Sequence, residues 1–270
     1  MKKQKKITII VCLIIILFMI IGIVQINKDT EKEIQTNASA ISNKKIGWGL
    51  KREKDHKRPD LGKENQELLQ KYDGYGIGNE TSNKIYLTFD EGYEAGYTEK
   101  ILDTLKEKQV TATFFITAHY LNTNEDLVKR MIEEGHIVGN HTVNHKSMPD
   151  LSDEQIKNEI LKLHQAIYEK TGYEMKYIRP PKGEYSERTL AVTNSLGYRT
   201  VMWSFAYMDW DEQKQNGEEK AKKMIIDNFH NGEIMLLHGN SKDNANVLDE
   251  IIDEARKMGY EFQSLDQFEK

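Results

Sequence analysis

From Lys84 onward, short apolar runs alternate about seven times with stretches of helical periodicity. The runs are rich in β-branched and aromatic residues and are expected to be buried strands, at residues 84–90, 111–117, 136–140, 175–180, 198–204, 233–238 and 260–264. Regular alternation of strand and helix predicts a parallel sheet. The most economical form is an α/β fold with a distorted, incomplete (β/α) barrel of about seven parallel strands, and a doubly wound open sheet is the alternative.

The stretches between the strands carry helix start and stop signals. Ser152 and Gln155 predict a capping box, while Asn124 and Ser186 are further N-cap candidates. A short helix is expected near Lys63 to Lys71. Glycines suited to helix ends follow the periodic stretches at Gly135, Gly172, Gly197 and Gly259.

The first 26 residues predict a signal-anchor that crosses the membrane as a helix. Four lysines are followed by an uncharged segment from Ile7 to Ile26, which is long enough to span a bilayer. The small-residue sequence Ala38-Ser39-Ala40 lies well past the apolar end, so an uncleaved anchor is favoured over a cleaved signal. The lysines are then inside and the chain from Asn27 onward is in the cell envelope; cleavage would secrete it instead.

Four parts are expected along the chain. Residues 1–26 are the anchor, 27–46 a flexible polar tether, 47–83 an irregular lead-in and 84–270 the α/β domain. The net charge of −5 argues against a nucleic-acid partner, which would require a basic face. Cys12 is the only cysteine and cannot form an intramolecular disulfide.

Residues of metal-binding and acid–base types gather at the predicted carboxyl ends of the strands. Active sites of α/β folds lie at this edge of the sheet. Each residue alone has an ordinary structural explanation, such as a loop brace, an Asx-turn or a hydrogen-bonded core histidine. Their joint occurrence at one rim favours a functional site. The residues are Asp90, Glu91, His141, His145, Arg179, Asp209 and His238.

Five short motifs contain these residues in a fixed order: TFDEG (88–92), HTVNH (141–145), RPPKG (179–183), MDW (208–210) and LLHG (236–239). The set resembles the motifs of the carbohydrate esterase family 4 polysaccharide deacetylases, over about residues 84–270. TFDEGYE, GNHTVNH, SKDNA (241–245) and WGLKR (48–52) are most similar to the spore-type peptidoglycan N-acetylmuramic acid deacetylases, the branch that forms muramic δ-lactam.

The resemblance implies that residues 84–270 are a catalytic domain that hydrolyses N-acetyl amides of cell-wall glycan. It implies Asp90 as the general base and Arg179 as the residue that orients this base. His238, held by Asp209, is then the proton donor to the leaving nitrogen.

The resemblance also implies one divalent metal ion, with Zn²⁺ the first candidate and other divalent transition metals as alternatives. Its expected ligands are Glu91, His141 and His145. Both imidazoles would lie on one side if HTVNH formed a single turn. Neighbours in a strand point to opposite faces, so Asp90 and Glu91 are not expected to share a proton, and Gly92 could let one acid reach the cation. Most of the family has aspartate at the second position; glutamate could leave the ion to the histidines and water alone.

Four residues near the motifs are candidates for glycan binding. Tyr93 and Trp210, like Tyr120 and Trp203, could stack on sugars, although more of these aromatics are expected in the core. The candidates for attracting the lactyl carboxylate of muramic acid are Lys182 and Lys242.

Peptidoglycan strands are the expected partner, besides the membrane, and no protein partner is implied. Two other functions stay open. One is deacetylation of peptidoglycan N-acetylglucosamine or chitooligosaccharide, and the other is a catalytically silent, membrane-tethered glycan-binding protein.

Overall fold

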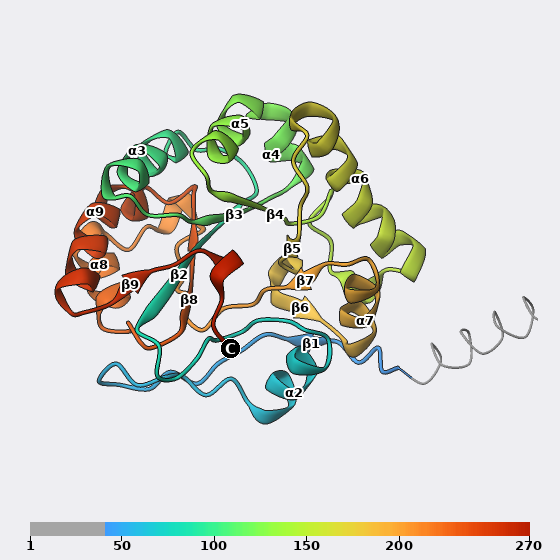
Figure 1. Ribbon diagram of the computed structural model, residues 1–270, viewed down its shortest axis with the longest axis horizontal. Helices are drawn as coiled ribbons and strands as arrows, with labels where there is room; N and C mark the ends of the chain where they lie inside the picture. Colours follow the sequence, from blue (N-terminus) through green and yellow to red (C-terminus); the bar gives the residue numbers. More distant parts are fainter. Residues whose placement is uncertain (1–40) are drawn as a thin grey trace, which may run out of the picture. The chain divides into compact units, whose positions relative to one another are not determined.

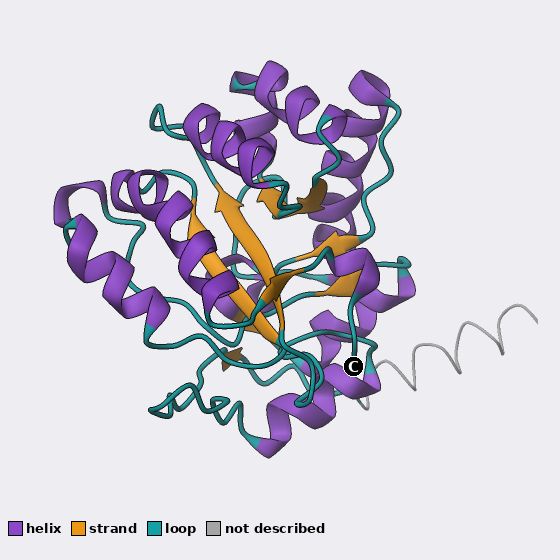
Figure 2. Ribbon diagram, turned by 60° about the vertical axis from the view of Figure 1, so that its left-hand side comes forward, coloured by secondary structure: helices purple, strands orange, loops and turns teal. Residues whose placement is uncertain are grey.

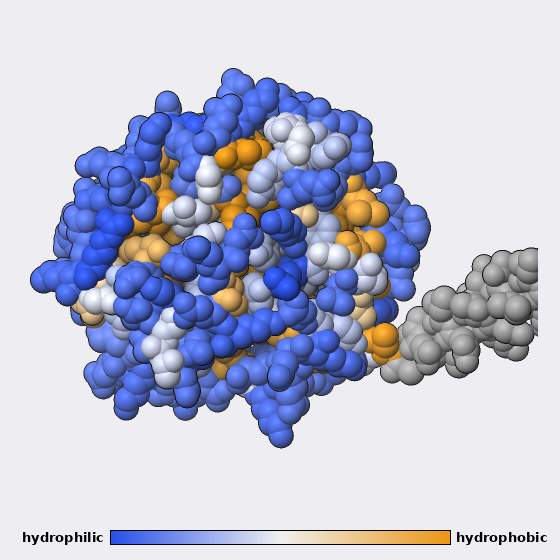
Figure 3. All heavy atoms as spheres, viewed as in Figure 1, coloured by the Kyte–Doolittle hydropathy of each residue, from blue (hydrophilic) through white to orange (hydrophobic). Residues whose placement is uncertain are grey.

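The structure is a computed structural model that describes residues 41–270 (Figure 1). The predicted anchor and most of the predicted tether lie outside the described residues. Within residues 41–270, no helix has the length and apolar character needed to cross a bilayer. Most of the surface seen in Figure 3 is hydrophilic, in keeping with a charged-residue content of 30%.

A seven-stranded parallel sheet forms the centre of the fold (Figures 1 and 2). Its interior residues are buried on both faces, which explains why the strands are continuous apolar runs rather than alternating ones. The order is β7 (Arg199–Thr200), β5 (Tyr177–Ile178), β4 (Ile137–Asn140), β3 (Thr113–Ile116), β2 (Lys84–Glu91) and β8 (Glu233–His238), and β9 (Glu261–Phe262) pairs with the start of β2. These are the seven predicted strands, most of them shorter than expected.

The sheet curls into a half-barrel instead of lying open. The segment that follows β7 reaches β8, where Phe205 forms a parallel bridge to Met235. The Phe205 carbonyl accepts a hydrogen bond from the Leu236 N–H at 2.9 Å. The prediction of a curled parallel α/β sheet is therefore confirmed.

Helices cover the outside of this sheet (Figure 2). Ser152 forms the predicted capping box with Gln155, and Gly172 ends that helix in the left-handed conformation. The helices are α2 (Lys63–Lys71), α3 (Thr98–Lys108), α4 (Ala118–Thr123), α5 (Glu125–Glu133), α6 (Asp153–Thr171), α7 (Glu187–Ser195), α8 (Glu218–Ile226) and α9 (Lys242–Lys257). Short 3₁₀ turns occur at Met148–Asp150, Pro181–Gly183, Glu212–Lys214 and Leu265–Gln267.

The lead-in packs onto the α/β domain, and residues 43–270 form one compact unit. Strand β1 (Ile46–Gly47) pairs antiparallel with β6 (Glu184–Tyr185). Trp48 continues this contact, because its backbone N–H donates to the Gly183 carbonyl at 2.8 Å and its Nε1–H donates to the Trp203 carbonyl at 2.9 Å. The lead-in thereby supports two loops that border the site described below.

Candidate active site

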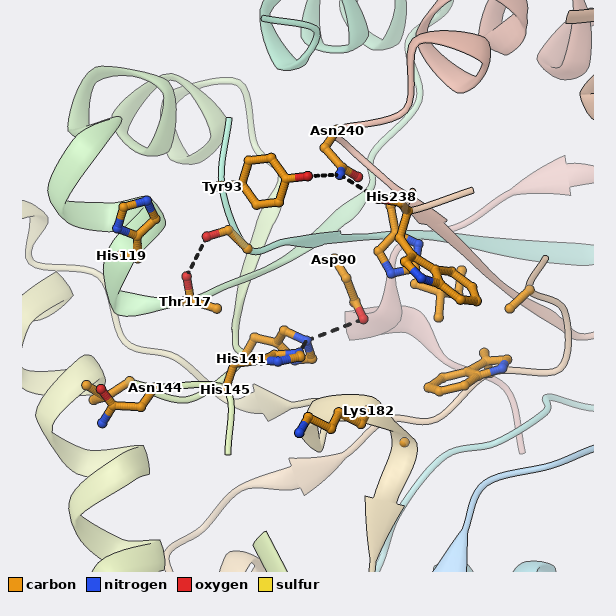
Figure 4. A pocket seen from close by; sticks show the side chains of 17 residues that line it. Asp90, Tyr93, Thr117, His119, His141, Asn144, His145, Lys182, His238 and Asn240 are labelled. Carbon is orange, nitrogen blue, oxygen red and sulfur yellow. Dashed lines mark hydrogen bonds and ion pairs between the residues drawn. The ribbon is translucent and has the colours of Figure 1, made fainter. Parts of the chain in front are cut away.

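A pocket of about 940 Å³ opens at the carboxyl ends of the parallel strands. Asp90 lies between the pair His141 and His145 on one side and His238 on the other (Figure 4). These side chains come from strand ends or from the loops that follow them, so the curled sheet brings together residues almost 150 positions apart in the sequence.

Asp90 is an ionised carboxylate held by a buried arginine. Its Oδ1 accepts a hydrogen bond from Arg179 at 2.8 Å. The guanidinium is fully buried, donates to the carbonyls of Val201 and Met202, and lies 4.3 Å from the centre of the Phe115 ring. Burial alone would raise the pKa of Asp90, but the positive charge of Arg179, aided by the two nearby histidines, lowers it below its usual value.

His141 and His145 present neutral imidazoles to one point. The Nδ1–H of His141 donates to the Arg179 carbonyl at 2.8 Å, which leaves the lone pair on Nε2. That Nε2 lies 3.1 Å from Nε2 of His145 and 3.6 Å from Oδ2 of Asp90. Burial lowers the pKa of both rings, to about 4 for His145, so both are unprotonated at neutral pH.

The loop that carries this pair is irregular, yet it brings both imidazoles to one side, as a single turn over HTVNH would have done. Thr142 and His145 have positive φ angles of 68° and 53°. The loop is held by side chains instead: Asn140 accepts from the Thr142 N–H at 2.9 Å, and the Glu159 carboxylate accepts two hydrogen bonds from Asn144. Sequence reasoning missed Glu159, although an acid next to Ile160 on the apolar face of α6 was a signal for such a role.

His238 is an imidazole paired with Asp209, as predicted. Its Nδ1 lies 2.7 Å from Oδ1 of Asp209, whose other oxygen accepts from the His238 N–H at 2.9 Å and from Asn244 at 2.6 Å. Burial would lower the pKa of His238, but the charge and hydrogen bond of Asp209 outweigh it and raise the pKa. Asn244 lies in the SKDNA sequence, and its role in holding Asp209 was not foreseen.

The structure turns the predicted metal ligand Glu91 away from the histidine pair. Strand β2 stays regular through residue 91, so the pleat turns Glu91 to the face opposite Asp90 and Gly92 does not redirect it. Its carboxyl is completely buried beside Thr98, away from the histidine pair. Within residues 41–270, no set of three or more His, Cys, Asp or Glu side chains surrounds one point in the manner of a complete metal site.

Three of the four predicted glycan-binding residues line the pocket, namely Tyr93, Lys182 and Trp210. The Tyr93 hydroxyl accepts a hydrogen bond from Asn240 at 2.8 Å, and the Trp210 ring lies 5.7 Å from that of His238. Lys182 lies on the side of the histidine pair and has a φ of 61°, which is uncommon for a residue with a side chain (Figure 4).

The fourth predicted residue, Lys242, is not part of this pocket. It begins α9 and borders a separate hollow beside the start of α8, so its proximity in sequence to His238 was misleading. Tyr120 is also excluded as a sugar platform, because it is fully buried and its hydroxyl donates to Glu94. Pocket-lining residues that sequence reasoning missed are Thr117, His119, Asn144 and Asn240.

The pair His141 and His145 fits a divalent cation. Two nitrogens that bind one Zn²⁺ at about 2.0–2.1 Å are roughly 3–3.4 Å apart, and the observed separation is 3.1 Å. The Nε2 lone pair of His141 is available because its Nδ1–H donates to the Arg179 carbonyl, and the neutral ring of His145 offers its own Nε2 lone pair as the Nδ1–H tautomer. With an ionised carboxylate beside them and a protonatable imidazole opposite, the arrangement defines the class of site: acid–base hydrolysis with a place for one cation.

Comparison with known proteins agrees with this class. The family model described as polysaccharide deacetylase matches residues 77–201. A curated relative, the peptidoglycan-N-acetylmuramic acid deacetylase PdaA of Bacillus subtilis strain 168, is 45% identical over 236 residues, which cover 86% of this chain and 90% of that protein. The chain belongs to the polysaccharide deacetylase family, and the predicted enzyme class is confirmed.

Solved structures give the same result. The structure of B. subtilis PdaA, described as a family 4 carbohydrate esterase, matches with a TM-score of 0.82 at 44% identity and covers 84% of this chain and 98% of that one. A family 4 carbohydrate esterase from Bacillus anthracis matches with a TM-score of 0.72 at 45% identity, covering 85% and 98%. Among the curated relatives, a peptidoglycan-N-acetylglucosamine deacetylase from Bacillus cereus is 34% identical over 186 residues, or 68% of this chain and 86% of that protein.

Proposed function

We propose that this chain removes the N-acetyl group of N-acetylmuramic acid residues in peptidoglycan, as a step towards muramic δ-lactam. The observation that carries the proposal is the position of ionised Asp90 between two neutral imidazoles and the His238–Asp209 pair. The muramic substrate is supported by the identity of 45% to a relative named for that activity, over 90% of the relative's length.

His141 and His145 would hold one divalent ion through their Nε2 atoms, with Zn²⁺ as the expected metal. Such an ion supplies a Lewis acid that lowers the pKa of water and polarises an amide carbonyl. Glu91 lies outside this set, so water and substrate oxygen would complete the coordination.

Asp90 would take the proton from the attacking water. Its Oδ1 is occupied by Arg179, whereas Oδ2 faces the histidine pair at 3.6 Å from His141. The buried guanidinium keeps the carboxylate ionised and fixes its direction, which is what a general base requires.

His238 would deliver a proton to the departing nitrogen. Asp209 binds Nδ1 and raises the pKa of the ring, so the Nε2–H side remains available to donate near neutral pH. The water oxygen forms a bond to the carbonyl carbon, the C–N bond breaks, and the products are acetate and a free amine. The second proton of the water leaves when the acetic acid ionises to acetate, and return of the proton held by Asp90 to His238 restores the starting protonation states.

Lys182 would attract the lactyl carboxylate of muramic acid. It lies in the pocket beside His145 and forms no ion pair with another residue in the described part of the chain. Replacement by alanine should raise KM about fivefold on muramic-containing glycan, since an ion pair at a partly exposed site contributes roughly 1 kcal/mol. Equal losses on glycan that carries only N-acetylglucosamine would contradict this role.

The apolar sequence from Ile7 to Ile26 supports export and membrane anchoring of the catalytic domain in the cell envelope. Protease accessibility on intact cells, compared with lysed cells, tests this location. If the domain resisted the protease in protoplasts, which lack the wall but keep an intact membrane, this location would be contradicted.

Mass analysis of muramidase digests tests the substrate. We expect the full-length protein, loaded with Zn²⁺, to yield fragments that lack the acetyl group on muramic acid, together with acetate in equal amount. Acetyl loss confined to glucosamine would favour the alternative deacetylase. Binding of glycan without release of acetate would instead indicate the silent glycan-binding protein.

A further inference from the structure

The carboxyl group of Glu91 is buried without a strong polar partner. The side chain is completely inaccessible, and its Oε2 has no hydrogen-bond partner among residues 41–270. The other oxygen, Oε1, lies 3.5 Å from the Thr98 hydroxyl, at the outer limit of a hydrogen bond. Packing therefore holds this carboxyl in place, and a buried polar group with no partner calls for an explanation.

The carboxyl occupies the space that a side chain at Gly239 would take. A Cβ atom added at Gly239 would lie 1.9 Å from Oε1, 2.3 Å from Cδ and 2.4 Å from Oε2 of Glu91. These are the three nearest atoms to that position. Gly239 does not have a positive φ angle, so the close approach of Glu91, rather than the backbone conformation, requires glycine here.

Gly239 separates two residues that line the pocket, His238 and Asn240. Gly239 also contacts the strand that carries Asp90. Its N–H donates to the Asp90 carbonyl at 3.4 Å, and the neighbouring His238 pairs with Asp90 in the β2–β8 register. A group that presses on Gly239 therefore acts on the segment that carries the proposed proton donor.

We propose that Glu91 is a positioning residue, whose carboxyl packs against Gly239 and sets the place of His238 relative to Asp90. The inference rests on the proposed function, in which His238 is the proton donor. It gives the second acid of TFDEG a role on the hidden face of β2, where it contacts neither the substrate nor the cation.

The surroundings of Glu91 favour a neutral carboxyl. Burial, followed by the negative charges of Glu94 and Asp90, raises its pKa well above the usual value. A protonated carboxyl has nearly the shape of an amide, so glutamine can fill the same space. Alanine would leave a void instead, and aspartate would be too short to reach Gly239.

A double-variant cycle tests the contact between these two residues. The full-length variants are Glu91→Ala, Gly239→Ala and the combination, with Glu91→Gln as the matched control. We expect Glu91→Gln to keep kcat within about threefold and to bind the same amount of Zn²⁺ per chain. Glu91→Ala and Gly239→Ala should each lower kcat roughly 10- to 100-fold with little change in KM, because small displacements of a catalytic group carry costs of this order.

The combination is the decisive variant. Gly239→Ala should cost much less in the Glu91→Ala background, because the methyl group then enters vacated space. The His238 ring signal in NMR titration gives the same test without activity: its pKa should fall in Gly239→Ala and recover in the combination. If Gly239→Ala folds only when combined with Glu91→Ala, the contact is equally supported.

Two results would overturn the inference. One is an equal effect of Gly239→Ala on the His238 titration in both backgrounds, or no effect in either. The other is loss of bound Zn²⁺ in Glu91→Gln, which would return Glu91 to the metal site. If the wild-type protein released no acetate, the proposed function would fail, whereas the titration would still decide whether Glu91 positions His238.

Discussion

Strand β8 has a histidine and a carboxylate near each of its ends, and the two groups differ in what they can do. At the carboxyl end, His238 is bonded to Asp209 at 2.7 Å and lines the pocket. At the amino end, Glu233 is the first residue of β8 and His230 lies three positions before it. Nε2 of His230 accepts from the Ser204 hydroxyl at 2.8 Å, and its Nδ1 lies 3.7 Å from Glu233. Both groups consist of residue types found in catalytic sites.

Access and pairing separate the two groups. Ser204, His230 and Glu233 are at most 2% exposed, so no substrate reaches them. Nδ1 of His230 donates to the Asn228 carbonyl instead of a carboxylate, and burial lowers the pKa of His230 to about 4 while it raises that of Glu233 well above the usual value. The surroundings of the buried group therefore favour the uncharged forms of both His230 and Glu233, whereas Asp209 favours the charged form of His238.

The most direct way to break this comparison is to remove each histidine in turn. His238→Gln should lower kcat about 10²- to 10⁴-fold, the usual contribution of a general acid. His230→Gln should leave kcat within about twofold per folded molecule, because this residue contacts no reacting group. Acetate release, normalised to the folded fraction from circular dichroism, measures both. A comparable loss in the two variants would contradict the separation drawn here.

Replacing Asp209 sharpens the comparison at the active end. Asp209 raises the pKa of His238, so the proton donor stays protonated to a higher pH. In Asp209→Asn the pKa falls, and the alkaline limb of the kcat profile should move to lower pH, with kcat about 10- to 100-fold lower at neutral pH. If the alkaline limb stayed at the same pH in Asp209→Asn, it would report the titration of a group other than His238.

The buried histidine should act on acid stability. Its pKa is about 4 in the folded protein against an ordinary value of 6.5, so the unfolded chain binds more protons between these pH values. Unfolding then becomes easier as the pH falls, by about 1.4 kcal/mol per pH unit and up to roughly 3 kcal/mol in total. Denaturant unfolding of His230→Gln between pH 7 and 4 should show a shallower loss than the wild type.

The buried carboxyl of Glu233 should have the opposite effect on how stability depends on pH. The pKa of Glu233 is raised in the folded protein, so folding retains a proton that the unfolded chain releases above its ordinary pKa. The stability that Glu233 contributes therefore falls as the pH rises from the ordinary pKa of a glutamate towards the raised pKa of the folded protein. Glu233→Gln should make the free energy of unfolding, measured with denaturant, fall less steeply with rising pH, without changing kcat. A steeper fall than in the wild type would contradict the predicted direction.

The sequence predicted the sheet because strand burial and helix caps are local signals. The seven apolar runs became the seven parallel strands, and α2 begins and ends at the predicted residues. The capping box at Ser152 likewise depends only on residues three positions apart. None of these features required knowledge of long-range contacts.

The site was only partly predictable for the opposite reason. The pleat of β2 argued for separate roles of Asp90 and Glu91 but could not show that Glu91 lies against Gly239. Lys242 is near His238 in sequence, yet the first turn of α9 carries it to another hollow. The contacts of Glu159 and Asn244 with the site depend on tertiary packing, which no local motif encodes.

The most direct test of the account compares two neighbouring acids in the same assay. Acetate release from muramic-containing glycan is measured for the wild type, Asp90→Asn and Glu91→Gln, with bound Zn²⁺ determined for each. The account predicts a loss of about 10³-fold or more for Asp90→Asn, and nearly full activity and metal content for Glu91→Gln. Undiminished turnover by Asp90→Asn, or loss of both metal and activity in Glu91→Gln, would contradict it.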